Sequence, residues 1–315
     1  MIDLRKLTYY QTGGGCDKFY APTSQTELQS AVSDLATSNT PYFILGAGTN
    51  SLVSDRHWQG VVLSLHKMNV LEVRGDVIVC QAGVLNASVV SAALANDLAG
   101  VGWMHRLPGQ IGATTRMNAR CYGGEISQVV KSVTAVSAQG ELRTYRHASM
   151  FRGYKDTVFM RNGDIITAVE LQLQAGDKKN IQSLMRHAER DRIAKGHFLY
   201  PSCGCVFKND HRLGLPSGLL LEKAGVHRLA QGRVFVNRKH ANFIFNDGGS
   251  SADIVSLSLQ MREAVYQQFG IWLQYEMEFL GKFSPDLQAE LQRQEETDMG
   301  NSNYLALLAV RGRCK

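Results

Sequence analysis

The sequence lacks several patterns that assign a chain to common classes of protein. Its six cysteines form no C-x-x-C pair, so neither a zinc site nor a thioredoxin-like motif is expected. No apolar run approaches the roughly 18–20 residues that cross a bilayer. The first residues also lack the basic-then-apolar order of a signal peptide. We therefore expect a cytoplasmic protein with no metal site and no membrane partner, whose cysteines are mostly small buried hydrophobic residues.

The sequence also has no recognised nucleic-acid motif, although it is basic. Its net charge is +6 and its pI is about 9.0. The positive charge is dispersed apart from a run within residues 178–195 and the C-terminal tail. Because a basic protein also attracts small polyanionic ligands such as nucleotides, a nucleotide ligand is favoured over nucleic acid.

What the sequence does contain is alternating helical and strand patterns, which predict an α+β fold. Strands are expected at residues 41–45, 61–65, 77–81, 165–173 and 271–280. A capping box at Ser24–Glu27 is expected to open one helix, and Asn86 is expected to cap a second. Further helices are expected to begin at Lys178 and at Ser250 or Ser251. The helix over residues 178–195 is expected to be a solvated surface helix.

These patterns predict a division of the chain into three domains or subdomains and a C-terminal tail. The first α+β unit is expected to cover residues 1–66, and a second unit residues 67–177. A further domain is expected over residues 178–281. Residues 282–315 are polar and irregular up to a short apolar patch at 304–310, and they read as a C-terminal tail with room for one docked helix.

The most informative short segment is a glycine turn that follows an apolar strand. Residues 41–51 read Pro-Tyr-Phe-Ile-Leu-Gly-Ala-Gly-Thr-Asn-Ser. Glycine permits positive φ and close backbone approach, which a backbone-amide cradle requires. The turn predicts a cradle for a phosphate or pyrophosphate, although an ordinary turn fits these residues equally well when they are taken alone.

Further segments carry residues suited to ligand contacts. Glycines at 107–112 and 117–124 would let the backbone lie against a flat or phosphorylated ligand, and structural loops are the alternative. Tyr154 and Lys155 lie between apolar residues and suit an anion contact, although a strand edge is the simpler explanation. In the segment 201–209, Lys208 would favour the thiolate of Cys205, although an incidental cysteine is favoured in isolation.

The last of these segments are two stretches of the C-terminal third. Residues 239–246 start a strand with polar groups. Alternation along a final strand would point Glu276 and Glu278 to one face. A solvated strand face is the ordinary explanation for these carboxylates.

The order of these motifs resembles the UDP-N-acetylenolpyruvoylglucosamine reductases, flavoenzymes of bacterial peptidoglycan precursor synthesis. The resemblance covers about residues 5–281 and is strongest to the branch that lacks a tyrosine-bearing insertion in the substrate domain. The matching segments are 12–14, 45–55, 107–112, 117–125, 153–159, 200–209 and 239–244. The resemblance implies two FAD-binding subdomains of the vanillyl-alcohol-oxidase type and a C-terminal α+β substrate domain.

The resemblance also implies the cofactors and the reaction. NADPH would reduce the bound FAD, which would reduce UDP-N-acetylglucosamine enolpyruvate to UDP-N-acetylmuramate. The FAD pyrophosphate would lie against the glycine turn, and the flavin ring near the Pro108 and Tyr122 loops. The residues expected to contact the cofactor are Gly46, Ala47, Gly48, Thr49, Asn50, Ser51, Pro108, Gly109, Gly112, Asn118, Tyr122 and Gly123.

By position, the resemblance implies three catalytic residues. Cys205 would be the proton donor, where the family usually has serine, and Glu276 would be the carboxylate partner. Lys155 would be the cation at the substrate carboxylate, where the family has arginine. A thiol is a far stronger acid than a hydroxyl, so Cys205 is chemically suited to the donation. The residues expected to bind substrate are Tyr154, Lys155, Lys208, Asn209 and His240.

Two alternatives stay open at the level of sequence. Arg116 and Arg120 fall where the family has small or apolar residues, and with Lys155 they suit a divergent flavoenzyme acting on another small anionic substrate. A non-catalytic flavin-binding module is the second alternative. The sequence leaves the oligomeric state open, with a monomer favoured.

Overall fold

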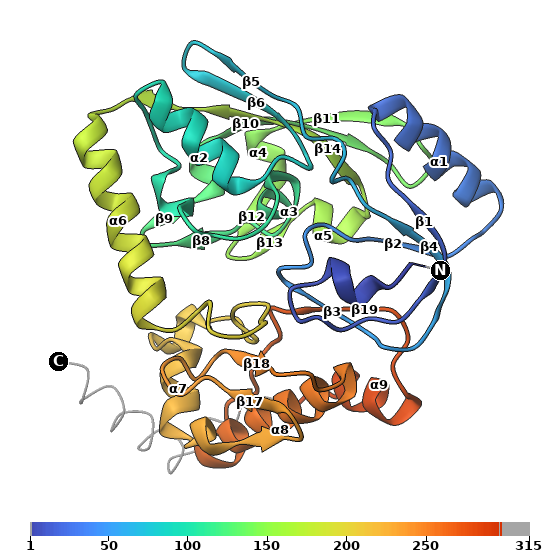
Figure 1. The fold of residues 1–315 in the computed structure, drawn as a ribbon, viewed down its shortest axis with the longest axis vertical. Coiled ribbons are helices and arrows are strands. Elements are labelled where there is room, and N and C mark those ends of the chain that lie inside the picture. The colour runs from blue at the N-terminus through green and yellow to red at the C-terminus, as the bar shows by residue number, and fades with distance from the viewer. Residues whose placement is uncertain (1, 296, 298–315) are drawn as a thin grey trace. The chain divides into compact units, whose positions relative to one another are not determined.

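The computed structural model describes residues 2–295 and 297, so the apolar patch at 304–310 lies outside the described part of the chain. The chain divides into two compact units, each built from segments far apart in sequence (Figure 1). Unit 1 comprises residues 2–16, 48–58 and the described residues from 193 onward. Unit 2 comprises residues 17–47 and 59–192. The finer division into subdomains at residues 66 and 177 stays a prediction.

Unit 2 contains a five-stranded antiparallel sheet in the order β11-β10-β14-β6-β5 (Figure 1). Its strands are β5 (Leu71–Arg74), β6 (Val77–Gln81), β10 (Val130–Val136), β11 (Leu142–Arg146) and β14 (Ile165–Gln172). The central strand β14 is rich in β-branched residues, and its Val169 and Leu171 are fully buried. Such a strand suits a pleated surface that packs against helices. The strands expected at 77–81 and 165–173 are confirmed.

A smaller sheet leads into the glycine turn. It has the order β1-β4-β2, with β1 at Cys16–Tyr20, β2 at Tyr42–Ile44 and β4 at Trp58–Leu63. Helix α1 (Gln25–Thr37) begins where predicted, because the Ser24 side chain accepts a hydrogen bond from the Glu27 N–H at 3.2 Å. The strands expected at residues 41–45 and 61–65 are present as β2 and β4, with slightly shifted ends.

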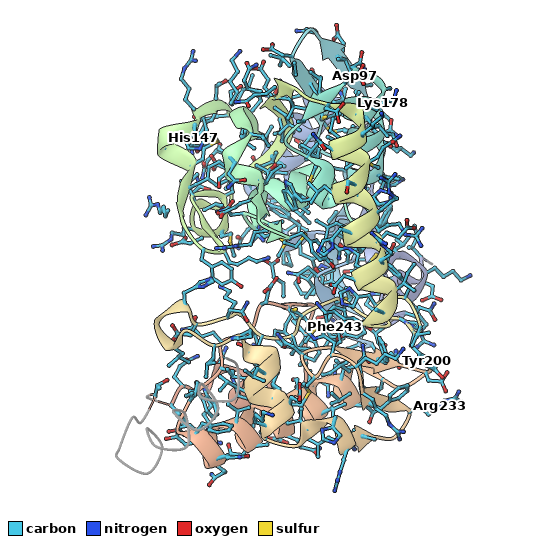
Figure 2. The ribbon with its side chains drawn as sticks, turned by 90° about the vertical axis from the view of Figure 1, so that its left-hand side faces the viewer. Asp97, His147, Lys178, Tyr200, Arg233 and Phe243 are labelled. Atoms are coloured by element: carbon cyan, nitrogen blue, oxygen red, sulfur yellow. The ribbon has the colours of Figure 1, made fainter. Side chains whose placement is uncertain are left out.

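The other elements of unit 2 are short, apart from α6. Its helices are α2 (Asn86–Ala95), α3 (Ile111–Arg116), α4 (His147–Met150), α5 (Phe159–Asn162) and α6 (Lys178–Ala194). Its paired short strands are β7 (Leu98–Ala99) with β15 (Gln174–Ala175), β8 (Arg120–Cys121) with β9 (Gly124–Glu125), and β12 (Phe151–Gly153) with β13 (Asp156–Thr157). Figure 2 shows Asp97 beside the start of α6, where the Asp97 carbonyl accepts the Gly176 N–H at 2.8 Å.

Unit 1 packs helices against a small antiparallel sheet, with Leu52, Phe207 and Ile254 in its core. The sheet has the order β16-β17-β18. The helices and strands of unit 1 are β3 (Ser51–Val53), α7 (Ser217–Lys223), β16 (Ala230–Gln231), β17 (Val234–Val236), β18 (Ile244–Asn246), α8 (Ser251–Phe269), β19 (Glu278–Leu280) and α9 (Pro285–Gln292). The 3-10 turns of the two units are Leu4–Leu7, Gly102–Met104, Ile126–Gln128, His211–Leu213 and Val226–Arg228.

Three local expectations are wrong. Asn86 does not cap α2 but is its first residue, and its Oδ1 instead accepts the Thr114 hydroxyl at 3.0 Å. Of residues 271–280, only β19 is a strand, because its partner β3 is three residues long. The tail is not irregular throughout, because Ser284 caps α9 and Pro285 occupies its first turn.

Candidate functional site

The glycine turn has a backbone suited to an anion. Leu45 donates to the Leu63 carbonyl, and the backbone N–H groups of residues 46–50 then donate to no acceptor among the described residues. Gly48 has φ of +64°, and a Cβ there would lie 2.7 Å from the Thr8 Cα. Since a side chain at Gly48 would be both strained and blocked, glycine is required. The open amides fit the pyrophosphate that the sequence predicts.

In unit 1 the second half of this turn is bonded to the segments that carry two predicted catalytic residues. The Asn50 side chain donates to the Glu276 carbonyl at 3.0 Å. The Asn50 carbonyl accepts the Glu278 N–H at 2.9 Å. The Cys203 thiol donates to the Gly48 carbonyl at 3.4 Å and to the Ser51 carbonyl at 3.1 Å. Asn50 thus holds the backbone of Glu276, a role that its place in a phosphate-type turn did not predict.

The structure brings the segments of Cys205 and Glu276 together within unit 1. The Val206 carbonyl accepts the Glu276 N–H at 2.8 Å, and Phe207 forms a bridge with Tyr275. On the other side, Cys205 forms a bridge with Phe243, which Figure 2 labels. Cys205 and Glu276 are both partly exposed. They therefore lie on adjoining backbone segments, and both are within reach of a ligand.

An aromatic stack supports these adjoining segments. The rings of Phe207 and Tyr275 are stacked with centroids 5.0 Å apart. The Arg262 guanidinium lies 4.8 Å from the Tyr275 ring, and the Tyr275 hydroxyl is 3.0 Å from the Ser258 Oγ. Burial raises the pKa of Tyr275, so its hydroxyl stays neutral. A stack of this kind gives Glu276 a rigid backbone support.

The predicted substrate residues of unit 1 serve structural contacts in this state. The Asn209 Oδ1 accepts the Ser217 N–H at 2.9 Å at the start of α7. The Lys208 N–H donates to the Gln274 carbonyl at 2.8 Å. The His240 ring centroid lies 4.6 Å from that of Phe243. Direct contacts of Lys208, Asn209 and His240 with substrate stay predictions.

In unit 2, Tyr154 and Lys155 form the tip of the β12–β13 hairpin rather than a strand edge. The Lys155 side chain is only 7% exposed, and its φ is +52°. A non-glycine residue in the left-handed region costs roughly 1–3 kcal/mol and persists where the surroundings enforce it, often at functional sites. The Tyr154 ring lies 5.4 Å from the Arg120 guanidinium carbon.

Asn118 connects this hairpin to the predicted flavin loop. Its amide group is buried and donates to the Glu125 carboxylate and to the Gly153 carbonyl, the latter at 3.0 Å. Its Oδ1 accepts the Ser127 N–H at 3.3 Å. Because its amide is bonded within the protein, Asn118 supports the loop, and a direct contact of Asn118 with FAD stays a prediction.

The Pro108–Gly112 turn is held against the large sheet. The Gly109 carbonyl accepts the Asn86 N–H at 3.0 Å, and Gly109 has φ of +124°. A Cβ on Gly112 would lie 2.7 Å from the Ala82 Cβ. Gly112 therefore allows α3 to pack closely against Ala82, the residue after β6. Contacts of Pro108 and Gly109 with the flavin stay predictions.

Tyr122 is fixed by α6. Its hydroxyl donates to the Asp191 carboxylate at 2.8 Å, and the Arg192 guanidinium carbon lies 5.0 Å from its ring centroid. Burial, and then the bond to Asp191, raise the pKa of Tyr122 well above its ordinary value. At the adjacent Gly123, which has φ of +78°, no protein atom lies within 4 Å of an added Cβ. The backbone here is open to a flat ligand.

Arg192 was missed at the level of sequence, because α6 was expected to be a solvated helix. Arg192 is only 6% exposed, and the buried Ile181 and Ala188 lie on the same helix. The spacing of these three residues places them on one face. A charged residue on the apolar face of an otherwise polar helix was therefore the available signal.

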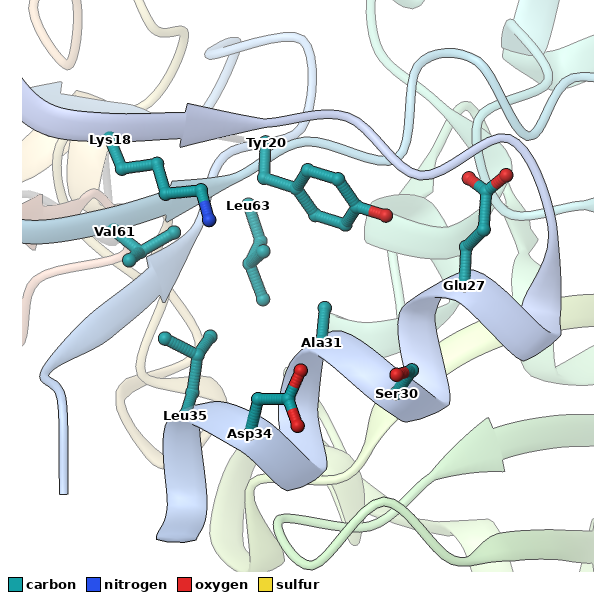
Figure 3. Close-up of a pocket in the computed structure, with 9 residues that line it drawn as sticks. All are labelled: Lys18, Tyr20, Glu27, Ser30, Ala31, Asp34, Leu35, Val61 and Leu63. Atoms are coloured by element: carbon teal, nitrogen blue, oxygen red, sulfur yellow. The ribbon is translucent and has the colours of Figure 1, made fainter. Parts of the chain in front are cut away.

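A separate pocket of about 310 Å³ lies between α1 and the smaller sheet (Figure 3). It is lined by Lys18, Tyr20, Glu27, Ser30, Ala31, Asp34, Leu35, Val61 and Leu63. None of the predicted site residues lines it. Within the described residues, no group of His, Cys, Asp or Glu side chains is arranged to hold a metal ion, and no helix is long and apolar enough to cross a membrane.

Two family models match the chain, one in its N-terminal half and one in its C-terminal third. Residues 17–146 match the family model of an FAD binding domain, and residues 196–280 match that of the UDP-N-acetylenolpyruvoylglucosamine reductase C-terminal domain. The UDP-N-acetylenolpyruvoylglucosamine reductase of Clostridium novyi is 32% identical over 284 residues, covering 90% of this chain and 92% of the relative. That of Carboxydothermus hydrogenoformans is 34% identical over 281 residues, covering 89% and 92%.

A solved structure is similar over nearly the same length. The crystal structure of UDP-N-acetylenolpyruvylglucosamine reductase from Thermus caldophilus has a TM-score of 0.75 and 27% sequence identity. The match covers 88% of this chain and 97% of that one. The predicted fold class, an α+β FAD-binding fold with a C-terminal α+β domain, is confirmed.

Proposed function

Because the chain belongs to the UDP-N-acetylenolpyruvoylglucosamine reductase family, we propose that it reduces UDP-N-acetylglucosamine enolpyruvate to UDP-N-acetylmuramate, with NADPH as reductant. The observation that carries the proposal is the joining of Cys205 and Glu276 on adjoining backbone segments, bonded to Asn50 of the glycine turn. A thiol and a carboxylate beside the turn that would hold the cofactor suit reduction of an enol ether.

The residues present fit FAD. The open amides of residues 46–50 suit its pyrophosphate, and the open backbone at Gly123 suits a flat ring. Bound FAD would supply the hydride chemistry, which would carry the reducing equivalents of NADPH to the β-carbon of the enolpyruvyl group. Asn118 and Asp191 hold the loop and the Tyr122 hydroxyl in place for that cofactor.

The side chains of this chain supply the rest of the chemistry. As the β-carbon gains a hydride, negative charge develops on the substrate carboxylate and the α-carbon. Lys155 places a buried cation for that charge, which stabilises the transition state more than the ground state. The Cys205 Sγ–H then gives its proton to the α-carbon, which completes the saturated product, and solvent later returns a proton to the sulfur. Glu276 acts as the carboxylate partner of this step.

Anaerobic stopped-flow absorbance tests the proposal. NADPH should bleach the bound flavin, and the enolpyruvyl substrate should then restore its colour. In Cys205→Ala, bleaching by NADPH should keep its rate while recolouring slows by about 100-fold or more, because general acid catalysis typically contributes that much.

Two outcomes would count against the proposal. If the flavin of the wild-type protein were bleached by NADPH but ignored the substrate, a divergent flavoenzyme acting on another small anion would be the better reading. A protein that could not be loaded with FAD would be a non-catalytic module. Cys80→Ala, which removes a fully buried thiol of the large sheet, is the matched control and should leave both rates unchanged.

A further inference from the structure

Arg192 is a buried cation of unit 2 that neither the sequence motifs nor the proposed chemistry uses. Its side chain is only 6% exposed. One terminal nitrogen, Nη2, donates to the Cys121 Sγ at 3.2 Å, and the guanidinium lies against the Tyr122 ring at 5.0 Å. Its Nε–H has no acceptor among the described residues. A sulfur atom is a weak acceptor, so the donors of this guanidinium are poorly satisfied.

The charge of Arg192 is also poorly compensated. The carboxylate next to it in sequence, Asp191, accepts the Tyr122 hydroxyl. No ion pair between Arg192 and a carboxylate occurs in the described part of the chain. Burying a charge without a counter-charge is strongly unfavourable. A buried arginine in this condition is suited to an anion that arrives with a ligand.

A second buried cation, Lys155, lies on the β12–β13 hairpin, which is bonded to the same loop as α6. The Asn118 amide of this loop donates to the Gly153 carbonyl of the hairpin at 3.0 Å. The Tyr122 hydroxyl of the loop donates to the Asp191 carboxylate of α6 at 2.8 Å. Lys155 is as deeply buried as Arg192. Lysine supplies a point charge, whereas arginine supplies parallel N–H donors that match the two oxygens of a carboxylate.

We propose that Arg192 and Lys155 together bind the carboxylate of the enolpyruvyl substrate, with Arg192 supplying the forked contact through its Nε–H and a terminal N–H. Arg192 is then a substrate-binding residue of the reaction, and it exchanges the weak thiol acceptor for a carboxylate oxygen when substrate arrives. This inference rests on the proposed function, because it requires an enolpyruvyl substrate.

Two probes separate the carboxylate from other anions. The first is the enolpyruvyl substrate, and the second is UDP-N-acetylglucosamine, which has the same nucleotide diphosphate but no carboxylate. Binding of each is measured by the change in flavin absorbance of the oxidised holoenzyme. Arg192→Met should weaken binding of the first probe by about 30-fold, as expected for removal of one partner of a buried charge pair, and should change binding of the second by less than about twofold.

A conservative variant and a control complete the design. Arg192→Lys keeps a charge but loses the fork, so it should weaken binding of the enolpyruvyl substrate by an intermediate factor, and it serves if Arg192→Met does not fold. The control is Arg190→Met, whose exposed side chain lies on the same helix. It should leave both affinities unchanged.

Several results would overturn the inference. Equal weakening for both probes would assign Arg192 to the diphosphate of the substrate. A loss of bound FAD with unchanged substrate affinity would assign Arg192 to the cofactor. Unchanged affinities in both Arg192 variants would leave Arg192 as a structural residue. If wild-type reduced flavin ignored the enolpyruvyl substrate, the proposed function itself would fail, which is a different result from any of these.

Discussion

The cysteines of this chain differ in how far water and reagents can reach them. Cys80 and Cys203 are buried, and burial raises the pKa of Cys80 to about 12 and that of Cys203 still further. Both therefore remain protonated near neutral pH, and their thiolate forms only at high pH. Cys205 is partly exposed, so reagents in solution can reach its sulfur more readily.

This difference predicts the pattern of alkylation. Iodoacetamide at about pH 8, near the ordinary pKa of a thiol, should label Cys205 faster than Cys80 and Cys203 because the thiolate is the nucleophile. Recolouring of the flavin by substrate should be lost in proportion to labelling, while bleaching by NADPH continues. Peptide mass mapping checks the order of labelling.

Cys205→Ser is the control for that measurement. It removes the thiol and keeps a weaker acid, so it should resist inactivation by iodoacetamide and retain slower recolouring. Inactivation of Cys205→Ser at the wild-type rate would place the sensitive thiol elsewhere. Within the described residues, Cys121 is the other partly exposed cysteine, and its labelling would be measured in that case.

Among the elements, α8 is the clearest case of a helix whose ends are encoded locally. The Ser250 side chain accepts the Asp253 N–H at 3.1 Å, and the Asp253 carboxylate accepts the Ser250 N–H at 2.9 Å. Gly270 ends the helix with φ of +67°. Ile254 and Val255 are then fully buried in the core of unit 1. Local caps and a buried face therefore agree.

Loss of the cap should weaken unit 1. Ser250→Ala leaves the Asp253 N–H without its acceptor and should lower the free energy of unfolding by about 1 kcal/mol. Urea denaturation of the FAD-loaded protein measures the change. Ser256→Ala, in the middle of the same helix, should change it by no more than about 0.5 kcal/mol. Equal effects of the two substitutions would mean that the cap does not stabilise the helix.

For the whole molecule, FAD should act as a stabilising ligand whose affinity depends on its pyrophosphate. A ligand that binds only the folded protein adds about 2.7 kcal/mol at 100 times its dissociation constant. FAD should therefore raise the melting temperature of protein stripped of flavin. Riboflavin, which has the ring but no pyrophosphate, should raise it much less, because it cannot use the open amides of residues 46–50.

The matched variant for that experiment is Ala47→Pro, which removes one amide donor from the turn. It should reduce the advantage of FAD over riboflavin. If riboflavin stabilised the wild-type protein as well as FAD does, the turn would not be the pyrophosphate cradle.

Much of the fold follows from local signals, and the exceptions have physical causes. The Ser24 and Ser250 caps, the start of α6 and the strands at 77–81 and 165–173 were all predictable, because caps and hydrophobic spacing depend on neighbouring residues. The helix α9 was missed because its short sequence is polar, although Ser284 followed by Pro285 is a helix-start signal.

Some features of the candidate site were likewise predictable from the sequence, and others were not. The sequence by itself determined the family, the FAD-binding fold and the glycine turn, because ordered motifs and backbone requirements are local. Only the tertiary structure decided that Cys205 and Glu276 lie on adjoining segments, that Asn50 holds the Glu276 backbone, and that Arg192 is buried beside Cys121. These contacts join residues far apart in the chain, and no short spacing in the sequence encodes them, because they depend on how whole elements pack.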